Sequence, residues 1–236
     1  MSGDGKTLTL ARQGLRDTTI LISLYRRRLL KDGSSGSSSG SSSSEILGSV
    51  LLSLDLSFNH LTTVNGLRNF SKLRHLDLSH NNLMDVRCRY PPRLETLKLS
   101  HNNITSIEGL GGMEEGLLRV LDLSHNPLRV VDGIMHLKGL TELDLSHTRL
   151  GKPLDVRLLS FNASLQSLSI IGTPLAQKSV KSGKVVIMSL LPGLRLFNHN
   201  PTSTSRRTKC KDRNEGETAV NRSSKSSTTT SPSAHT

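Results

Sequence analysis

The chain has 236 residues, of which 34% are apolar and 3% aromatic, and its formal net charge is +12. Two Ser-rich segments, residues 33–44 and 202–236, account for the low apolar fraction, so we expect one folded body with disordered appendages. More than half of the excess positive charge lies outside residues 46–199, and few aromatic side chains are present to stack bases, which argues against nucleic acid as the main partner.

Residues 1–32 are predicted to form a degenerate capping repeat ahead of the regular ones. Five positions follow, less regularly, the spacing of the repeats described below: Leu8, Leu10, Gln13, Leu15 and Thr18. A cap is expected because the first regular strand would otherwise present an apolar open edge. An unrelated amphipathic segment stays open as the alternative. The segment has no secretory signal, and its apolar run at residues 19–25 is too short to cross a bilayer, so we expect no membrane span.

Residues 33–45 consist almost entirely of Gly and Ser. They are predicted to be a flexible insertion between the capping repeat and the first regular repeat. Such an insertion costs little stability, because the entropy of closing a loop grows only slowly with its length.

Six copies of the pattern L-x-x-L-x-L-x-x-N-x-L fill residues 46–176, with Thr in place of Asn in the last two. The Asn or Thr recurs after 22, 21, 24, 22 and 25 residues. The L-x-L pair predicts a short strand whose leucines point inward, and successive strands are expected to lie side by side in one parallel sheet. Because no copy can bury its apolar face alone, the array is expected to fold as one stack with both ends covered.

The Asn falls in the turn after each strand, where a buried amide can satisfy backbone groups that would otherwise lack a partner. This role is predicted for four residues: Asn59, Asn81, Asn102 and Asn126. Thr148 and Thr173 offer only a hydroxyl in its place, so looser turns are expected there.

Beyond the Asn, apolar side chains with helix-like spacing are predicted to pack the opposite, convex side of the stack, as at Val131, Ile134 and Leu137. The pair Pro91-Pro92 excludes a helix from the second repeat, where we expect an extended segment. The convex side is therefore expected to be part helical and part irregular.

The repeated pattern resembles the 22-residue class of leucine-rich repeats typified by a regulatory subunit of protein phosphatase 1. Residues 177–199 resemble the C-terminal cap of that class: residues 191–194 (LPGL) match the cap motif, whereas Phe197-Asn198 stands where Leu-Asp is typical. The resemblance implies an α/β leucine-rich-repeat solenoid with a parallel concave sheet and a short helical or irregular convex side. It implies as partners a phosphatase catalytic subunit, axonemal dynein or other ciliary machinery, or a spliceosomal ribonucleoprotein.

Residues 200–236 are basic and rich in Ser and Thr, and they are predicted to be a disordered tail. The two cysteines, Cys88 and Cys210, are too few for a disulfide framework. We therefore expect a reducing, intracellular location: the cytoplasm, with cilium, cytoskeleton and nucleus left open.

The concave face is expected to present the variable residues between and after the strand leucines: Asp55, Phe58, His75, Asp77, His80, Lys98, His101, Asp122, His125, Glu142, Asp144 and His147. Four aspartates in one column, interrupted by Lys98, are expected to form an acidic stripe that suits a basic segment of a protein partner. The alternative, which stays open, is that Asp is the consensus residue of L-D-L-S-x-N. Because Phe58 is the only aromatic residue expected on this face, a weak or avidity-assisted contact is predicted.

Four of these histidines, each directly before the Asn or Thr of its repeat, suggest a metal site or a pH sensor: His80, His101, His125 and His147. One imidazole per repeat, however, does not give the converging ligands of a zinc site. Repetition of L-S-H-N accounts for them, and no metal is predicted. The Asp, Ser and His of each copy are not expected to converge into a triad, and no nucleotide-binding or zinc-protease motif occurs. We predict no catalytic residue, no cofactor and no enzymatic activity.

The sequence therefore predicts a monomeric, non-enzymatic adaptor that binds a protein partner on its concave face. Cytoskeletal or ciliary scaffolding is the first hypothesis, by analogy with the family. A phosphatase regulatory subunit is the second, and a ribonucleoprotein assembly factor whose basic tails contact RNA is the third.

Overall fold

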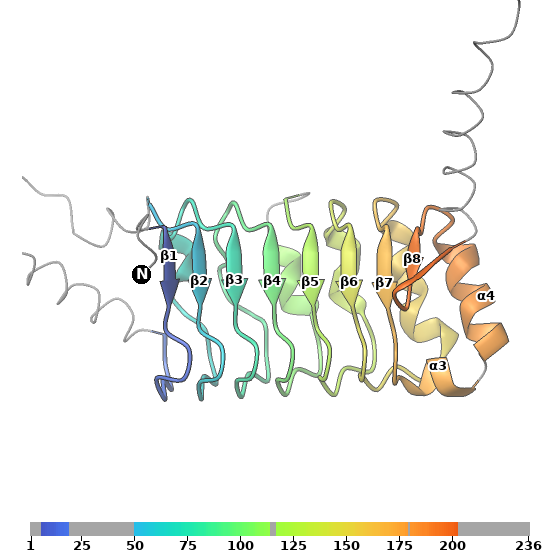
Figure 1. The fold of residues 1–236 in the computed structure, drawn as a ribbon, viewed down its shortest axis with the longest axis horizontal. Coiled ribbons are helices and arrows are strands. Elements are labelled where there is room, and N and C mark those ends of the chain that lie inside the picture. The colour runs from blue at the N-terminus through green and yellow to red at the C-terminus, as the bar shows by residue number, and fades with distance from the viewer. Residues whose placement is uncertain (1–5, 19–49, 114–116, 179, 203–236) are drawn as a thin grey trace, which may run out of the picture.

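Short strands, one from each repeat, form a single sheet along the length of the computed structural model, which describes residues 6–18, 50–113, 117–178 and 180–202 (Figure 1). The strands in chain order are β1 Thr7–Thr9, β2 Ser53–Asp55, β3 His75–Asp77, β4 Thr96–Lys98, β5 Val120–Asp122, β6 Glu142–Asp144, β7 Ser167–Ser169, β8 Leu196–Phe197 and β9 Asn200–Pro201. Neighbours in the sheet are neighbours in the chain, and every pair is parallel except β8 with β9. The predicted solenoid with a parallel sheet is confirmed.

A line of leucines sets the register of the sheet. The central Leu of each strand lies opposite that of the next, from Leu8 in β1 to Leu168 in β7, and the line ends on Phe197 in β8. These side chains are buried, and so are the leucines that flank each strand, such as Leu51 and Leu56. Because side chains alternate along a strand, the residues on either side of the central Leu face outward. The core is thus one continuous apolar column behind the sheet.

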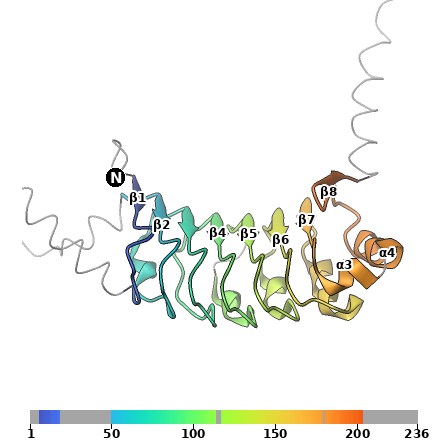
Figure 2. The same cartoon turned by 60° about the horizontal axis from the view of Figure 1, so that its bottom comes forward.

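The convex side is built from short 3-10 helices: η1 Leu67–Asn69, η2 Glu108–Gly112, η3 Asp132–His136 and η4 Pro153–Phe161 (Figure 2). Each buries an apolar side chain in the core: Leu67, Leu110, Ile134 and Leu159. The second repeat has no helix between β3 and β4, and its chain runs irregularly to Pro91, as the Pro91-Pro92 pair predicts. The predicted mixture of helical and irregular convex segments is confirmed.

Both ends of the stack carry additional structure. At the N-terminal end, β1 pairs with β2, and Leu8 and Leu15 are buried. At the other end, α3 Pro174–Lys178 and α4 Val180–Leu190 follow the last repeat, Leu191 and Leu194 are buried, and β8 pairs with β7. The apolar edges that a single repeat leaves open are therefore covered within the described chain. The predictions for residues 19–32, 33–45 and 203–236 lie outside the described residues.

Candidate functional site on the concave face

A buried Asn fixes the turn after each of the first four regular strands. In the second repeat, Asn81 Nδ2 donates to the carbonyl oxygens of Leu56, Leu78 and Ser79 at 3.0, 3.0 and 3.2 Å. Its Oδ1 accepts the backbone N–H of Leu61 at 3.0 Å. Equivalent bonds are made by Asn59, Asn102 and Asn126. Each amide joins its own repeat to the preceding one, so the side chains that surround the turn are held in line from repeat to repeat.

Thr148 keeps the turn without an amide. Its hydroxyl donates to Leu145 O at 2.7 Å. The φ of the preceding residue, His147, is 57°, against 54–56° at the equivalent residues of the four earlier repeats. Main-chain bonds from His147 N to Ile171 O (2.6 Å) and from Arg149 N to Leu128 O (2.8 Å) hold this conformation. The looser turn expected at Thr148 is therefore wrong for the backbone.

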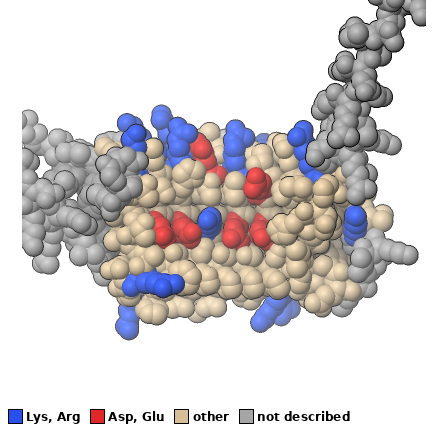
Figure 3. All heavy atoms as spheres, viewed as in Figure 1, with Lys and Arg blue, Asp and Glu red and all other residues tan. Residues whose placement is uncertain are grey.

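The acidic stripe, defined as Asp55, Asp77, Asp122 and Asp144, lies in one column of the sheet. Figure 3 shows it as a row of acidic side chains that crosses the strands with one basic side chain in the middle. That position on β4 is Lys98, whose Nζ lies 3.7 Å from Asp77 Oδ2. In the preceding column, His75 and Glu142 are exposed. The sheet thus displays negative charge on a chain that is basic as a whole.

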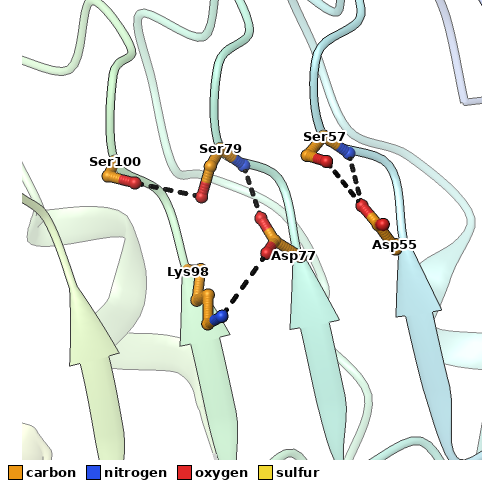
Figure 4. A network of polar contacts seen from close by, with 6 residues as sticks. All are labelled: Asp55, Ser57, Asp77, Ser79, Lys98 and Ser100. Carbon is orange, nitrogen blue, oxygen red and sulfur yellow. Dashed lines mark hydrogen bonds and ion pairs between the residues drawn. The ribbon is translucent and has the colours of Figure 1, made fainter. Parts of the chain in front are cut away.

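Each aspartate of the stripe is also part of its own turn. One carboxylate oxygen accepts the backbone N–H of the Ser two residues later, at 2.8–3.0 Å in the four repeats. Figure 4 shows this bond for Asp55 and Asp77. Asp55 and Asp122 accept the hydroxyl of that Ser as well, at 2.7 Å. A structural role of Asp as the consensus residue of the repeat therefore accounts for one oxygen of each carboxylate. The second oxygen of Asp55, Asp122 and Asp144 has no partner among the described residues, and the three side chains are partly exposed.

Five rings form a second row next to the stripe, at the residue that precedes the buried Asn or Thr. This ring stack consists of Phe58, His80, His101, His125 and His147. Neighbouring centroids are 4.0, 4.1, 4.0 and 4.3 Å apart, and the planes are inclined by 10–17°. All five residues have left-handed backbone, with φ between 54° and 57°. Because this conformation recurs once per strand, at a spacing of ~4.8 Å, the side chains point the same way and the rings meet face to face.

Two other residues end the ring stack. Arg12, with a φ of 58°, occupies the equivalent position in the N-terminal segment, and its guanidinium carbon lies 4.9 Å from the centroid of Phe58. Gly172, with a φ of 72°, occupies it after β7, where a Cβ would lie 2.4 Å from His147 Nδ1. The stack therefore has a cation at one end and bare backbone at the other.

Reasoning from sequence placed the histidines along a line but missed both the stacking and Arg12. It treated Phe58 as an isolated aromatic, whereas Phe58 is the first ring of the ring stack. The available signal was that Arg12, Phe58 and the four histidines occupy the same place in the repeat.

The middle of the ring stack is uncharged at neutral pH. The pKa values of His101 and His125 are lowered from the ordinary value of 6.5, mainly by desolvation and then by neighbouring imidazoles. The carboxylate of Asp122 acts in the opposite direction on both. The two central rings, His101 and His125, thus lie uncharged next to the carboxylates of the acidic stripe.

The described side chains of this face lie in rows along the sheet. Parallel rings do not converge on a common point, and among the described residues no group of three or more His, Cys, Asp or Glu is placed to hold a metal ion. Nor does any described helix have the length and apolar character needed to cross a membrane. The face presents charges, hydrogen-bonding groups and ring edges to solvent.

Two family models match the region that builds this face. Residues 92–150 match a model described as Leucine rich repeat, and residues 71–86 match a second one with the same description. Together with the parallel strands and the buried Asn of the turns, these matches show that this region of the chain consists of leucine-rich repeats. Proteins of this kind generally use an extended concave surface for binding other proteins.

The chain spans less than a fifth of the length of the two relatives named here. Podocan-like protein 1 of Mus musculus is 37% identical over 110 residues, which are 42% of this chain and 19% of that protein. Geranylgeranyl transferase type-2 subunit alpha of Pongo abelii is 32% identical over 124 residues, 52% of this chain and 18% of that one. A chain in the crystal structure of the Drosophila melanogaster SNF/U2A′ complex is 18% identical with a TM-score of 0.42, covering 51% of this chain and 68% of that chain.

Proposed function

We propose that this chain is a non-enzymatic scaffold that binds a protein partner along its concave face. The observation that carries the proposal is a pair of adjacent rows on one sheet, the acidic stripe and the ring stack, each repeated from strand to strand. Six strands at ~4.8 Å give a surface ~25 Å long, which accommodates an extended segment or a helix of a partner.

The partner segment that this face suits is basic. Complementary charge orients an approaching partner and raises its association rate. The carboxylates of the acidic stripe supply that charge, because each keeps an oxygen that its own turn does not use. Arg12 already packs its guanidinium against the first ring of the ring stack, which supports a contact of the same kind from a partner.

Three identities for the partner follow from the family resemblance of the repeat pattern. A cytoskeletal or ciliary protein, bound by a monomeric cytoplasmic chain, is the first. A phosphatase catalytic subunit and a ribonucleoprotein component are the alternatives. The experiment below separates them by naming the partner.

The experiment compares the full chain with two variants as baits for proteins of a cell lysate. Asp77→Asn/Asp122→Asn removes two charges from the acidic stripe, while the amide oxygen can still accept the Ser N–H of the turn. Glu108→Gln removes a carboxylate from η2 on the convex side and is the control. We expect a defined set of proteins to be retained by the full chain and by the control and to be lost from the double variant.

Retained proteins are then identified by mass spectrometry and tested singly for salt-dependent binding. A phosphatase subunit is expected to keep binding at high salt, whereas RNA held by basic tails is released steeply as salt rises. If the double variant retains the same proteins as the full chain, the concave-face proposal is overturned.

A further inference from the structure

A hollow lies on the convex side where the second repeat has no helix. It has a volume of about 610 Å³ and opens between η1, η2 and the irregular segment that precedes Pro91. A second hollow of about 410 Å³ adjoins it and shares Arg68, Cys88 and Arg89. We call the two together the convex hollow.

The floor of the convex hollow is held in place by the chain around it. Pro91 and Pro92 exclude a helix here, because proline lacks the N–H that a helical turn requires. The hydroxyl of Tyr90 donates to Val86 O at 3.0 Å. At Gly109 a Cβ would lie 2.7 Å from the backbone N of Arg87, so the third repeat approaches the second directly. The floor is thus formed by packed backbone and by the partly buried Cys88 and Tyr90.

The rim of the convex hollow is positively charged. Arg68, Arg87 and Arg89 line it together with the amides of Asn65 and Asn69, and among the described residues no carboxylate is part of the lining. Arg87 is paired with Asp85 at 3.4 Å. Arg68 and Arg89 are exposed and make no ion pair among the described residues. Burial raises the pKa of the Cys88 thiol to about 11, so the floor adds no negative charge at neutral pH.

The two parts of the convex hollow are lined by different kinds of side chain. The larger part is surrounded by guanidinium and amide groups, which donate hydrogen bonds. A guanidinium group can donate two parallel hydrogen bonds to the oxygens of one phosphate. The smaller part is lined by Tyr90, Pro92 and Met113, which suits an apolar side chain. Tyr90 is fixed through its hydroxyl in the floor and partly buried, so it does not offer the open ring on which a nucleic-acid base would stack.

We propose that the convex hollow binds a phosphorylated peptide segment of a protein, with the phosphate between Arg68 and Arg89 and an apolar side chain over Met113. The site borders η1 and η2, which lie on the side of the solenoid opposite the strands (Figure 2), so it is separate from the concave face. The scaffold then holds two partners at once, one of them only after phosphorylation.

The experiment measures binding of the full chain to fluorescent peptide libraries with a fixed central residue and degenerate flanks. The central residue is phosphoserine, serine or glutamate. We expect the phosphoserine library to bind at least about tenfold more tightly than the serine library, since each phosphate–guanidinium pair is a charge-assisted double hydrogen bond. Inorganic phosphate at high concentration is expected to compete.

Two variants test the location. Arg68→Gln/Arg89→Gln is expected to reduce binding of the phosphoserine library at least about tenfold, and Arg129→Gln/Arg157→Gln, which removes two exposed arginines elsewhere, is expected to leave it unchanged. Circular dichroism melts establish that both variants fold. Equal affinity for the phosphoserine and serine libraries overturns the proposal, as does equal loss in the two variants. A glutamate library that binds as tightly as the phosphoserine one, or single-stranded RNA that displaces the peptides more strongly than phosphate, overturns the assignment to a phosphopeptide.

Discussion

Asn102 exemplifies how much of the fold depends on single side chains. It is buried and bonds to the carbonyl oxygens of Leu78, Leu99 and Ser100 and to the N–H of Leu83. An aliphatic residue at this position leaves four backbone groups of two repeats without partners. The cost is therefore set by the orphaned backbone rather than by the size of the side chain.

Asn102→Ala is expected to lower the free energy of unfolding by about 3 kcal/mol, because a buried polar group without a partner costs roughly 1–3 kcal/mol and the turn relaxes in part. Urea denaturation followed by circular dichroism measures this change. The control is Asn103→Ala at the next, exposed position, which is expected to stay within about 0.5 kcal/mol of the parent chain. Equal midpoints for the two variants would contradict the role given to the ladder amides.

Each aspartate of the acidic stripe accepts hydrogen bonds within its turn and also presents a negative charge on the surface. Substitution can separate these two roles. Asp122→Ala is expected to lower the free energy of unfolding by about 1 kcal/mol, because the N–H and hydroxyl of Ser124 lose their acceptor. Asp122→Asn keeps an acceptor oxygen and is expected to cost less than half as much. Thermal denaturation of the two variants measures the difference, and a larger loss for Asn than for Ala would show that charge, not the turn bond, sets stability here.

At the scale of the element, the ring stack makes stability depend on pH. The pKa values of His101 and His125 are lower in the fold than the ordinary value of 6.5, so the unfolded chain binds more protons than the folded one as the pH falls below that value. The contribution of these residues is constant above pH 6.5 and decreases as the pH falls from there through the folded pKa values.

The expected result is that the parent chain loses more stability between about pH 7.5 and about pH 5.5 than His101→Asn/His125→Asn, in which Asn tolerates the left-handed backbone. Urea denaturation at the two pH values measures the loss. His136→Asn, an exposed change on η3, is the control and should behave as the parent chain does. Equal losses in the parent and in the double variant would rule out the stack as their source.

The end of the ring stack at Gly172 is equally open to test. Gly172→Ala is expected to cost about 2 kcal/mol or more, because its φ of 72° disfavours a side chain and the new Cβ meets the His147 ring. Gly14→Ala has a similar φ of 66° with nothing within 4 Å, and is expected to cost about 1 kcal/mol. Urea denaturation measures the loss of unfolding free energy in each variant. When His147→Ala removes the ring, the loss caused by Gly172→Ala is expected to fall toward that of Gly14→Ala. A loss that stays as large without the ring would refute the clash.

Sequence predicted the strands and missed the ring stack for a physical reason. An L-x-L pair with period two predicts which side chains enter the core, and the Asn spacing predicts the turn, because both patterns are local. Stacking depends instead on the left-handed φ of the residue before the Asn, combined with the spacing of strands from different repeats. The charge of the convex hollow was missed likewise, because Arg68 and Arg89 lie 21 residues apart and come together only through the irregular second repeat.

At the scale of the molecule, stability depends on covering the first strand. Leu8 lies opposite Leu54, and the N–H of Leu15 is bonded to Asn59 Oδ1 at 3.0 Å. Without this segment, β2 presents unpaired backbone and apolar side chains at the end of the sheet, which is the condition for pairing with another molecule.

Removing residues 1–18 is expected to convert the chain into a self-associating form. Multi-angle light scattering on size-exclusion fractions measures the mass. Arg12→Ala keeps β1 and removes only the cation over Phe58, so it serves as the control and is expected to leave the mass of the parent chain. A truncated chain with the parent's mass and stability would show that the first regular strand needs no cover.

Because the strands of the sheet are evenly spaced, the concave face restricts the spacing of the contacting groups in a partner segment that crosses it. Equivalent groups recur every ~4.8 Å, so every second strand repeats them after ~9.6 Å. An extended polyproline II chain advances ~3.1 Å per residue and therefore ~9.3 Å in three residues. A segment in that conformation with a cationic residue at every third position would meet Asp77 on β3 and Asp122 on β5, which are two strands apart, almost in phase. One with cations at every second position would drift out of step within two contacts. The spacing of repeats, and not only their charge, thus restricts which partner sequences fit.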